Sequence, residues 1–332
     1  MGFYFELDKK SSQTKTQQLL YAINESISNG ELKEGDFLPS INQLSKQSGL
    51  SRDTIFKTYS ILKQRSVLSS TPTKGYFVNS VSFKVMMLLD NFSAFKEQLY
   101  NSFRNNLPKS YTIDLLFHHY NADVFEQLIL NSLGRYSMYV VMNLNYQRIE
   151  KVINKIDSEK LLILDVGMPD NSDVSYVNQD FTLGVMDCLK EGLSKIRKYS
   201  QFHLVFPDSV SISHPRGLIP SFNYFCTHNN IESSVIKDME SFPVEAGQSF
   251  LVIKDDDLVN IIKQCKNKKL RIGKDVGIIS YNDSPMKEIV GSGITTISID
   301  FKEMGEKAAC FVKDKVKIFD TLSPRLIWRG SL

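Results

Sequence analysis

The apolar positions of the first 80 residues recur every three or four residues, which is the spacing of amphipathic helices. Leu19, Ile23 and Ile27 share one face of a helix predicted over residues 15–29, and Gly30 can end that helix in a left-handed conformation. Two more helices and a short hairpin are predicted to follow in the same region.

Capping residues mark the second and third predicted helices. Ser40 and Gln43 have the spacing of a capping box, and Gly49 ends the second helix after about two turns. Ser51 caps the third helix, in whose first turn the helix dipole favours the carboxylate of Asp53. A short helix, a glycine-containing turn and a second capped helix form the helix-turn-helix arrangement.

A hairpin is predicted after the third helix. Val67–Thr71 and Tyr76–Val78 are strand-like, and the turn Pro72–Gly75 joins them. Added to the three helices, this hairpin predicts a winged helix-turn-helix domain over residues 1–80.

The third predicted helix has two chemically different faces. Ile55, Tyr59 and Leu62 form an apolar stripe that faces inward. In the major groove, Arg can bind guanine and an apolar ring can contact a thymine methyl. The pattern leaves open that the outer face is instead the solvated surface of an interaction domain, with Phe56 binding a protein partner. That outer face carries Arg52, Asp53, Phe56, Lys57, Ser60 and Lys63.

Three motifs in fixed order give this region a family resemblance. They are G-x-L-x-x-G-D-x-L-P-S at Gly30–Ser40, S-R-x-T at Ser51–Thr54 and G-x-F-V at Gly75–Val78. With these motifs, residues 15–78 resemble the DNA-binding domain of GntR-family transcriptional regulators. The resemblance implies DNA contacts from the start of the second helix, from the third helix and from the wing. We expect these contacts at Lys15, Ser40, Asn42, Gln43, Ser51, Arg52, Asp53, Thr54, Phe56, Lys57, Lys74 and Gly75.

Two positions depart from the family pattern. The family usually has Arg at the position of Asn42, and often Arg or Val at the position of Phe56. Both changes alter the chemistry offered to the bases. No base preference of the family is therefore carried over to this chain.

Beyond a polar linker at residues 79–84, strand-like and helix-like segments alternate along the chain. This alternation predicts an α/β fold with largely parallel sheets that have helices on both faces. The segment is long enough for one large sheet or for two lobes. The apolar runs expected to be strands are Val85–Leu89, Tyr111–Phe117, Met138–Met142, Leu161–Val166, Phe202–Phe206, Phe250–Ile253 and Val276–Ser280.

The C-terminal third carries a second resemblance. Lys266–Val312 contains a basic segment, Asp-Val, an apolar strand, Tyr-Asn-Asp, Thr-Thr and a helix with Met-Gly-x-x-Ala, and Pro324–Ser331 follows. This order resembles LacI-type and periplasmic-sugar-binding effector domains, and its combination with a GntR-type head resembles the arabinose-repressor architecture. The resemblance implies a two-lobed, periplasmic-binding-protein-like effector domain over residues 84–332.

The same resemblance implies a small effector between the lobes, with a monosaccharide such as arabinose or fucose as the simplest choice. Planar Asp, Asn, Gln and Arg groups suit sugar hydroxyls, and an aromatic ring suits the apolar face of a sugar. Residues 177–180 are expected to form a ligand-facing loop, and the carboxylates of Asp256 and Asp283 are expected to point into the cleft. In the competing interpretation, about half of these polar residues only cap helices. The expected contacts are Asp90, Phe92, Gln179, Asp180, Arg216, Asp256, Asn282 and Asp283.

The charge distribution makes the predicted N-terminal domain weakly basic. The chain has 332 residues, 42% hydrophobic and 23% charged, which fits two or three globular domains. Residues 1–80 hold ten Lys and Arg against seven Asp and Glu, whereas the other 252 residues hold 30 of each sign. The whole net charge of +3 therefore lies in the first quarter. This bias permits nucleic-acid binding without establishing it.

Sequence features also bear on location. No apolar run approaches the ~18 residues of a membrane helix, and the N-terminus has no basic start followed by a long apolar stretch. Cys188, Cys226, Cys265 and Cys310 are at least 38 residues apart. We expect a cytoplasmic protein without a membrane partner, in which the cysteines are reduced and inert.

The familiar motifs of catalysis are missing. The sequence has no phosphate loop, no Gly-x-Ser-x-Gly elbow and no His-Glu-x-x-His. His118 and His119 are interpreted as a strand end near the core, and the triplet Asp255–Asp257 as a helix cap or a ligand-contact loop. We expect no enzyme activity, no cofactor and no metal. A sugar-modifying enzyme fused to a DNA-binding head is the alternative.

These features predict a ligand-controlled transcriptional regulator, most simply a repressor. A homodimer is expected. Because a two-fold dimer presents two identical DNA-binding domains, its double-stranded operator should be a near-palindrome. The effector is expected to close the cleft and change the spacing of the heads.

Overall fold

In a computed structural model of the chain, Lys74 and Arg216, two of the expected binding residues, lie outside the described residues. The chain divides into two compact units. The first comprises Met1–Met87, Pro108–Leu116 and Gln127–Tyr139, and the second Leu88–Leu107, Phe117–Glu126 and Val140–Leu332. The structure describes residues 3–8, 11, 13–28, 30–64, 67–71, 75–79, 83–144, 147–166, 169, 171–207 and 217–332.

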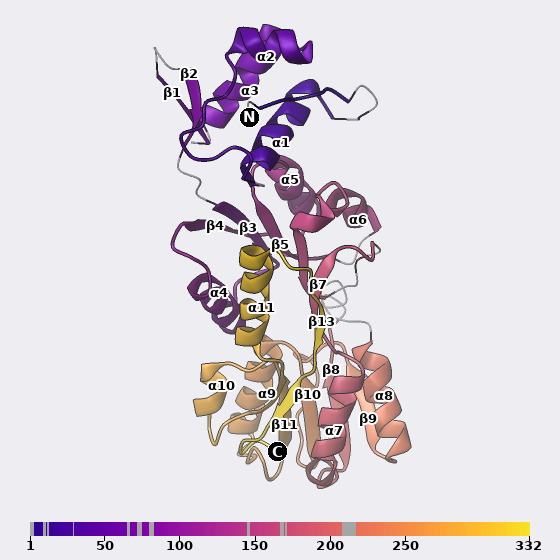
Figure 1. Cartoon of the computed structure of the whole chain (residues 1–332). Helices are drawn as coiled ribbons and strands as arrows, with labels where there is room; N and C mark the ends of the chain where they lie inside the picture. The colour runs from indigo at the N-terminus through magenta and orange to yellow at the C-terminus, as the bar shows by residue number, and fades with distance from the viewer. Residues whose placement is uncertain are drawn as a thin grey trace. The chain divides into compact units, whose positions relative to one another are not determined.

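The first unit contains the predicted winged helix-turn-helix (Figure 1). β1 and β2 pair antiparallel, with Leu68 opposite Val78. The predicted helices and hairpin are confirmed. The elements are α1 (Lys15–Ser28), α2 (Ile41–Ser48), α3 (Arg52–Gln64), β1 (Leu68–Thr71) and β2 (Gly75–Val78).

Local signals explain where these helices start and stop. Ser40 and Gln43 form a complete capping box, and Gly49 ends α2 in the left-handed region with a φ of 69°. The Ser51 hydroxyl accepts a hydrogen bond from the Thr54 amide at 3.2 Å, as an N-cap does.

One apolar core holds the winged helix together. Ile55 and Tyr59 of α3 are fully buried, as the apolar stripe predicted. The Tyr59 hydroxyl donates a hydrogen bond to the Pro39 carbonyl at 2.9 Å, which fastens α3 to the segment before α2. The sequence analysis did not place the N-terminal segment, which contributes Phe3 and Phe5 to this core.

Two six-stranded sheets form the rest of the chain, which confirms the α/β fold class and selects two sheets over one. The first has the order β13-β7-β6-β5-β3-β4 and the second the order β14-β12-β11-β10-β8-β9. In the second sheet the neighbours are parallel except for β14, which pairs antiparallel with β12. The strands are β3 (Phe83–Leu89), β4 (Tyr111–Phe117), β5 (Met138–Met142), β6 (Leu161–Asp165), β7 (Ser175–Gln179), β8 (Gln201–Val205), β9 (Glu232–Ile236), β10 (Gln248–Val252), β11 (Gly277–Tyr281), β12 (Thr295–Ser298), β13 (Phe319–Leu322) and β14 (Arg325–Ile327).

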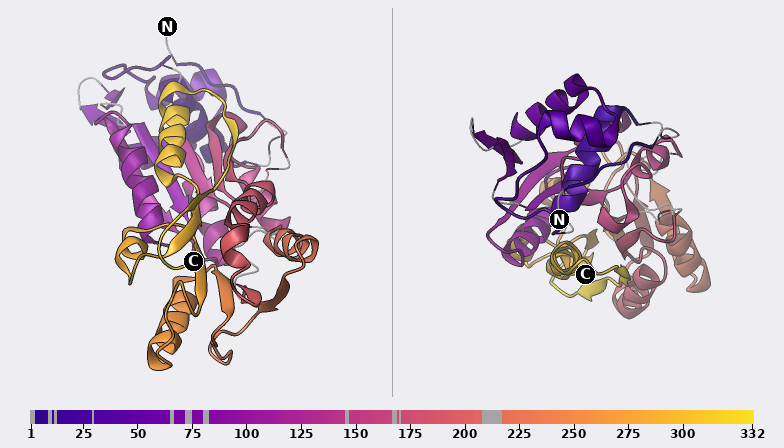
Figure 2. Two further views of the ribbon diagram at one scale, coloured as in Figure 1. Left: turned by 90° about the horizontal axis from the view of Figure 1, so that it is seen from below. Right: turned by 45° about the horizontal axis from the view of Figure 1, so that its top comes forward.

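Helices connect the strands, and two of them touch through a glycine. A Cβ added to Gly305 of α11 would lie 2.4 Å from the Leu99 carbonyl oxygen of α4, so only glycine permits this approach. The two helices lie side by side in Figures 1 and 2. The helices are α4 (Ala94–Asn105), α5 (Ala122–Ser132), α6 (Gln147–Ile153), α7 (Leu183–Ile196), α8 (Leu218–His228), α9 (Asp255–Asn267), α10 (Pro285–Ile289) and α11 (Phe301–Asp314), with a 3-10 turn at Ser158–Lys160.

The seven apolar runs predicted as strands are confirmed as β3 to β6, β8, β10 and β11. Two details were wrong. Residues 177–179 belong to a strand rather than a loop, because β7 pairs with β6 on one side and β13 on the other. Phe83 and Lys84 belong to β3 rather than to the linker, of which residues 80–82 lie outside the described residues. Lys84 pairs with Asp114 at 2.8 Å. In the described ranges, no helix combines the length and apolar character needed to cross a membrane.

Candidate ligand site and DNA-binding face

A hollow of about 500 Å³, here called the cleft hollow, opens where several strands end. Its wall comes from segments that follow β3, β4, β10 and β11, and all of them belong to the second unit. Open α/β sheets bind ligands at the carboxyl ends of their strands. The wall consists of Asn91, Phe92, Ser93, Phe95, Lys96, Tyr120, Ile253, Lys254, Asp255, Asp256, Tyr281 and Asn282.

The backbone at these strand ends is strained. His119 and Tyr120 follow β4 with φ angles of 49° and 58°, and Asn282 follows β11 with a φ of 58°. Asp165, the last residue of β6, has a φ of 74°. A bulky residue such as Tyr in this left-handed region costs on the order of 1–2 kcal/mol, whereas Asn and Asp adopt it more readily. Such strain gathers at ligand sites, where the surrounding contacts hold it in place.

A buried ion pair supports the wall of the cleft hollow. The Lys96 ammonium, which is 3% exposed, donates hydrogen bonds to Asp90 and to Asn91 Oδ1, the latter at 2.8 Å. The Tyr120 hydroxyl donates to the other carboxylate oxygen of Asp90 at 2.7 Å. Asp90, an expected ligand contact, is therefore bound by protein groups and is not part of the wall.

His118 is buried below the same strand end and is neutral. Its Nδ1 accepts a hydrogen bond from the Tyr120 amide at 3.2 Å, which leaves Nε2 to donate to the Met142 carbonyl at 3.2 Å. Burial lowers the pKa of His118 to about 4. The interpretation of His118 as a core residue at a strand end is confirmed. Among the described residues, no three His, Cys, Asp or Glu side chains are grouped to hold a metal.

Lys287 of α10 fastens the end of β11 to the start of α9. Its ammonium, which is 4% exposed, donates to the carbonyls of Tyr281 at 3.0 Å and Asn282 at 2.7 Å. It also pairs with Asp255 at 2.8 Å. These bonds hold Asn282 in its left-handed conformation and occupy the carboxylate of Asp255.

Several groups of the wall remain open to a ligand. Asp256 is exposed, and its carboxylate makes no hydrogen bond or ion pair within the described part of the chain. Asn282 Oδ1 and Ser93 Oγ are buried atoms without a hydrogen-bond partner there. The ring of Phe92 is 61% exposed. This set can accept hydrogen bonds from a ligand and offer it an aromatic face.

A second polar chain connects β6, β7 and β11 within the second unit. Gln179 donates its amide hydrogen to Asp165 and accepts from the Tyr281 hydroxyl at 3.3 Å. Burial raises the pKa of Asp165 to about 6, with Asp90 adding to the rise and Lys96 opposing it. Gln179, also an expected ligand contact, is therefore buried and occupied by these neighbours.

Asp180 lies outside the wall of the cleft hollow. Its carboxylate accepts hydrogen bonds from the amides of Thr182 at 3.0 Å and Gly184 at 2.9 Å. It therefore stabilises the first turn of α7 in the manner of a cap.

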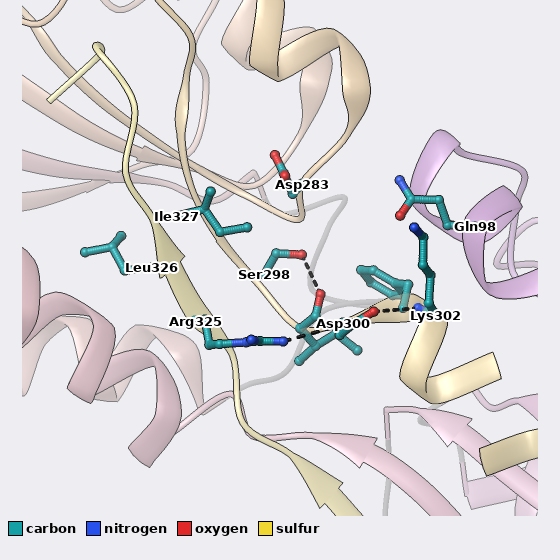
Figure 3. Close-up of a pocket in the computed structure, with 10 residues that line it drawn as sticks. Gln98, Asp283, Ser298, Asp300, Lys302, Arg325, Leu326 and Ile327 are labelled. Carbon is teal, nitrogen blue, oxygen red and sulfur yellow. Dashed lines mark hydrogen bonds and ion pairs between the residues drawn. The ribbon is translucent and has the colours of Figure 1, made fainter. Parts of the chain in front are cut away.

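Asp283 is also not part of the wall of the cleft hollow. Its two carboxylate oxygens accept from the Arg329 guanidinium at 2.8 Å each. Although burial opposes the shift, the hydrogen bonds and charge of Arg329 lower the pKa of Asp283. Asp283 lines a second hollow of about 490 Å³, shown in Figure 3 with Asp300 and Arg325. The predicted ligand contact by Asp283 stays a prediction. The ion pair with Arg329 does not favour it, because it occupies both carboxylate oxygens.

The acidic triplet at the start of α9 is not a helix cap. Lys254 occupies the N-cap position, and no side chain caps the helix. Asp255, Asp256 and Asp257 lie in the first turn, where the helix dipole favours carboxylates. Asp255 and Asp256 line the cleft hollow, as the alternative of a ligand-contact loop implied.

Sequence reasoning missed the two buried lysines. Lys96 has a sequence signal, because it precedes the buried Leu99 by three residues and the buried Phe103 by seven, on the inner stripe of α4. A lysine on an apolar stripe requires a buried anion. Lys287 lies in a five-residue helix, which is too short to show such a stripe.

The face of α3 predicted to bind DNA is open to solvent. Phe56 is 57% exposed, and Arg52, Asp53 and Lys57 are exposed, with Thr54 partly so. Some expected DNA contacts also cap helices: Ser40 and Gln43 bond each other, and the Ser51 and Thr54 hydroxyls lie 2.8 Å apart. Lys15, Asn42 and Gly75 are exposed as well.

Comparisons with known families match both parts of the chain. Residues 15–78 match the bacterial regulatory proteins of the gntR family, and residues 213–332 match the periplasmic binding protein-like domain. The uncharacterized HTH-type transcriptional regulator YcxD of Bacillus subtilis is 36% identical over 70 residues, which are 21% of this chain and 16% of that protein. The chain thus spans about a sixth of the length of this curated relative.

Solved structures resemble a larger part of the chain. The trehalose repressor from Escherichia coli has a TM-score of 0.61 at 14% identity, covering 74% of this chain and 100% of that one. A LacI family transcriptional regulator from Lactobacillus casei with bound sucrose has a TM-score of 0.61 at 12% identity, covering 75% and 99%. At these identities the likeness concerns the fold. The chain therefore joins a helix-turn-helix domain of the gntR family to a periplasmic-binding-protein-like domain with the fold of LacI-family regulators.

Proposed function

We propose that this chain is a transcriptional regulator, most simply a repressor, whose binding to operator DNA is controlled by a small effector in the cleft hollow. One observation carries the proposal: a gntR-type winged helix with an exposed Arg52 face and a periplasmic-binding-protein-like domain with a hollow at its strand ends occur in one chain. A regulator of this kind acts on the chromosome, so we place it in the cytoplasm.

The proposed effector is a small sugar. A hollow of about 500 Å³ is within the usual size of small-molecule sites, and its open acceptors and exposed Phe92 ring suit a polyhydroxylated ligand. The Lactobacillus casei regulator has been solved with sucrose and with glucose, which supports this class. We propose direct contacts from Phe92, Asp256 and Asn282, with Asp90 and Gln179 behind them. The effector shifts operator binding only by its different affinities for the two states of the protein.

Arg52→Ala is expected to weaken operator binding by about 1–3 kcal/mol, because a bidentate arginine contact to guanine contributes about that much discrimination. Binding to unrelated duplex DNA should change much less. Fluorescence anisotropy with operator and scrambled duplexes at one salt concentration measures both affinities. Lys46→Ala is the matched control, since it removes an exposed positive charge from the last turn of α2. Equal operator affinities for Arg52→Ala and the wild type would contradict the assignment of α3 to DNA.

Ile289→Asp is expected to shift the protein toward monomers and to weaken operator binding at least about tenfold, because buried interface anchors often contribute about 2 kcal/mol or more. Met286 and Ile289 of α10 are 62% and 69% exposed, and Val259 of the neighbouring α9 is exposed too. Exposed apolar side chains on α9 and α10 suit a two-fold interface. Sedimentation velocity measures the assembly. The control is Val316→Asp, at an exposed apolar residue outside α9 and α10, and an unchanged dimer in Ile289→Asp would place the interface elsewhere.

A further inference from the structure

Two cations beside the cleft hollow are already neutralised by the protein. Lys96 is buried against Asp90, and Lys287 is buried against Asp255. The Tyr120 hydroxyl also donates to Asp90. These donors therefore already make hydrogen bonds within the protein. A ligand could bind them only if those bonds were broken.

The charged groups at the start of α9 differ in their contacts. Burial raises the pKa of the Asp257 carboxyl, and the charge of Lys254 opposes that rise. Asp256 differs from its neighbours, because its exposed carboxylate has no hydrogen bond or ion pair within the described part of the chain. The wall of the cleft hollow thus holds one carboxylate, that of Asp256, which no protein group contacts within the described residues.

One unsatisfied atom of the wall, Asn282 Oδ1, also calls for a hydrogen-bond donor on the ligand. Asn282 Oδ1 is a pure acceptor, it is buried, and it has no partner among the described residues. The backbone of Asn282 is held on both sides, since its amide donates to the Ile297 carbonyl at 2.9 Å and its carbonyl accepts from Lys287. The acceptor is therefore preorganised for a donor on the ligand.

The aromatic part of the wall also tolerates a positive charge. The Phe92 ring is 61% exposed, and its edge-to-face neighbour is Phe117 at 6.2 Å between ring centroids. The negative face of an aromatic ring attracts a cation, whereas it does not attract an anion. Charge, hydrogen-bond acceptors and ring therefore favour the same kind of ligand.

We propose that the effector of the cleft hollow carries a protonated amino group next to its hydroxyls, as an amino sugar does, and that Asp256 binds the ammonium while Asn282 accepts from a neighbouring donor. This inference rests on the proposed function, because it names the ligand class of the same site. The inference adds one positive charge to the proposed sugar ligand, so an experiment can contradict the inference without contradicting the proposed function.

Matched pairs of probes test the charge. Calorimetric titration of the full chain compares D-glucosamine with D-glucose and D-galactosamine with D-galactose, and N-acetyl-D-glucosamine serves as a bulky neutral form. At least one amine should bind tenfold or more tightly than its neutral counterpart. Asp256→Asn, which keeps the shape of the side chain, should abolish that preference. Asp187→Asn removes an exposed carboxylate of α7 that does not line the hollow, and it should keep the preference.

The outcomes separate the two proposals. Neutral sugars that bind as tightly as their amines would overturn the amino-group inference and leave the proposed sugar-controlled regulator standing. A preference that survives in Asp256→Asn would also overturn the inference, as would the absence of binding by both amines. The proposed function is judged by a different measurement, operator binding by the wild type, and it fails if the chain binds no DNA sequence selectively.

Discussion

Asp90→Ala is expected to lower the free energy of unfolding by about 3–5 kcal/mol, because it leaves the ammonium of Lys96 buried without an anion. Lys96 is 3% exposed, so water cannot replace the missing carboxylate without opening the start of α4. Folded proteins have about 5–15 kcal/mol of stability in all. The change should therefore be visible as a large fall in the urea midpoint.

The double variant Asp90→Ala, Lys96→Met is the control for this prediction. Removing both charges leaves no buried ion, so the double variant should recover much of the stability that Asp90→Ala loses. If Asp90 instead acts by direct contact with the effector, Asp90→Ala would weaken effector binding without this loss of stability. Equal losses in the single and double variants would contradict the supporting role of the pair.

The winged helix could be predicted almost to the residue, because local signals determine it. The Ser40 capping box, the left-handed Gly49 and the Ser51 cap act within a few residues of themselves, and all three are present as expected. The apolar stripe that includes Ile55 and Tyr59 needed only the helical period. The N-terminal segment was missed, because nothing local shows that Phe3 and Phe5 bury in a core formed by later residues.

The two six-stranded sheets were predicted less completely than the winged helix. The strands that the sequence analysis did not predict share a physical reason. β9 and β14 are edge strands, and β12 and β13 have four residues each, so none forms a long apolar run. In β9, Glu232–Ile236, the first three residues are exposed. Their pairing depends on neighbours far along the chain, which the local pattern does not contain.

The cleft hollow was located in part. Phe92, Asp256 and Asn282 line it because each follows the end of a strand in an α/β fold, and that rule can be applied to the sequence alone. Asp90 is instead held by Lys96, and Asp283 by Arg329, which lies 46 residues away along the chain. Ion pairs between distant segments depend on the packing of whole elements, so no spacing rule could assign them.

Asp165→Asn is expected to raise the free energy of unfolding at neutral pH by about 3 kcal/mol, because the ionised Asp165 is held where burial raises its pKa from 3.8 to about 6. Since the folded-state pKa is the higher one, the folded wild type takes up a proton more readily than the unfolded chain between pH 6 and pH 4. The wild type therefore gains stability relative to the variant as the pH falls. The advantage of Asp165→Asn should be full near pH 7.5 and nearly gone at pH 4, as measured by urea denaturation at each pH.

Asp275→Asn is the control, because it is expected to lower the free energy of unfolding at neutral pH rather than raise it. Hydrogen bonds from Arg271 hold the pKa of Asp275 below its usual range, so its carboxylate stabilises the folded state at neutral pH and loses that effect in acid. Because a depressed pKa gives up its stabilisation only below the ordinary Asp value of 3.8, Asp275→Asn should keep its disadvantage from pH 7.5 to pH 4, whereas the advantage of Asp165→Asn fades over that range. A stability difference for Asp165→Asn that does not change with pH would mean that Asp165 is not ionised at a cost in the folded protein. If the difference does change, the chain keeps a destabilising carboxylate beside its strained strand ends, which is the pattern expected where a site is maintained for binding rather than for stability.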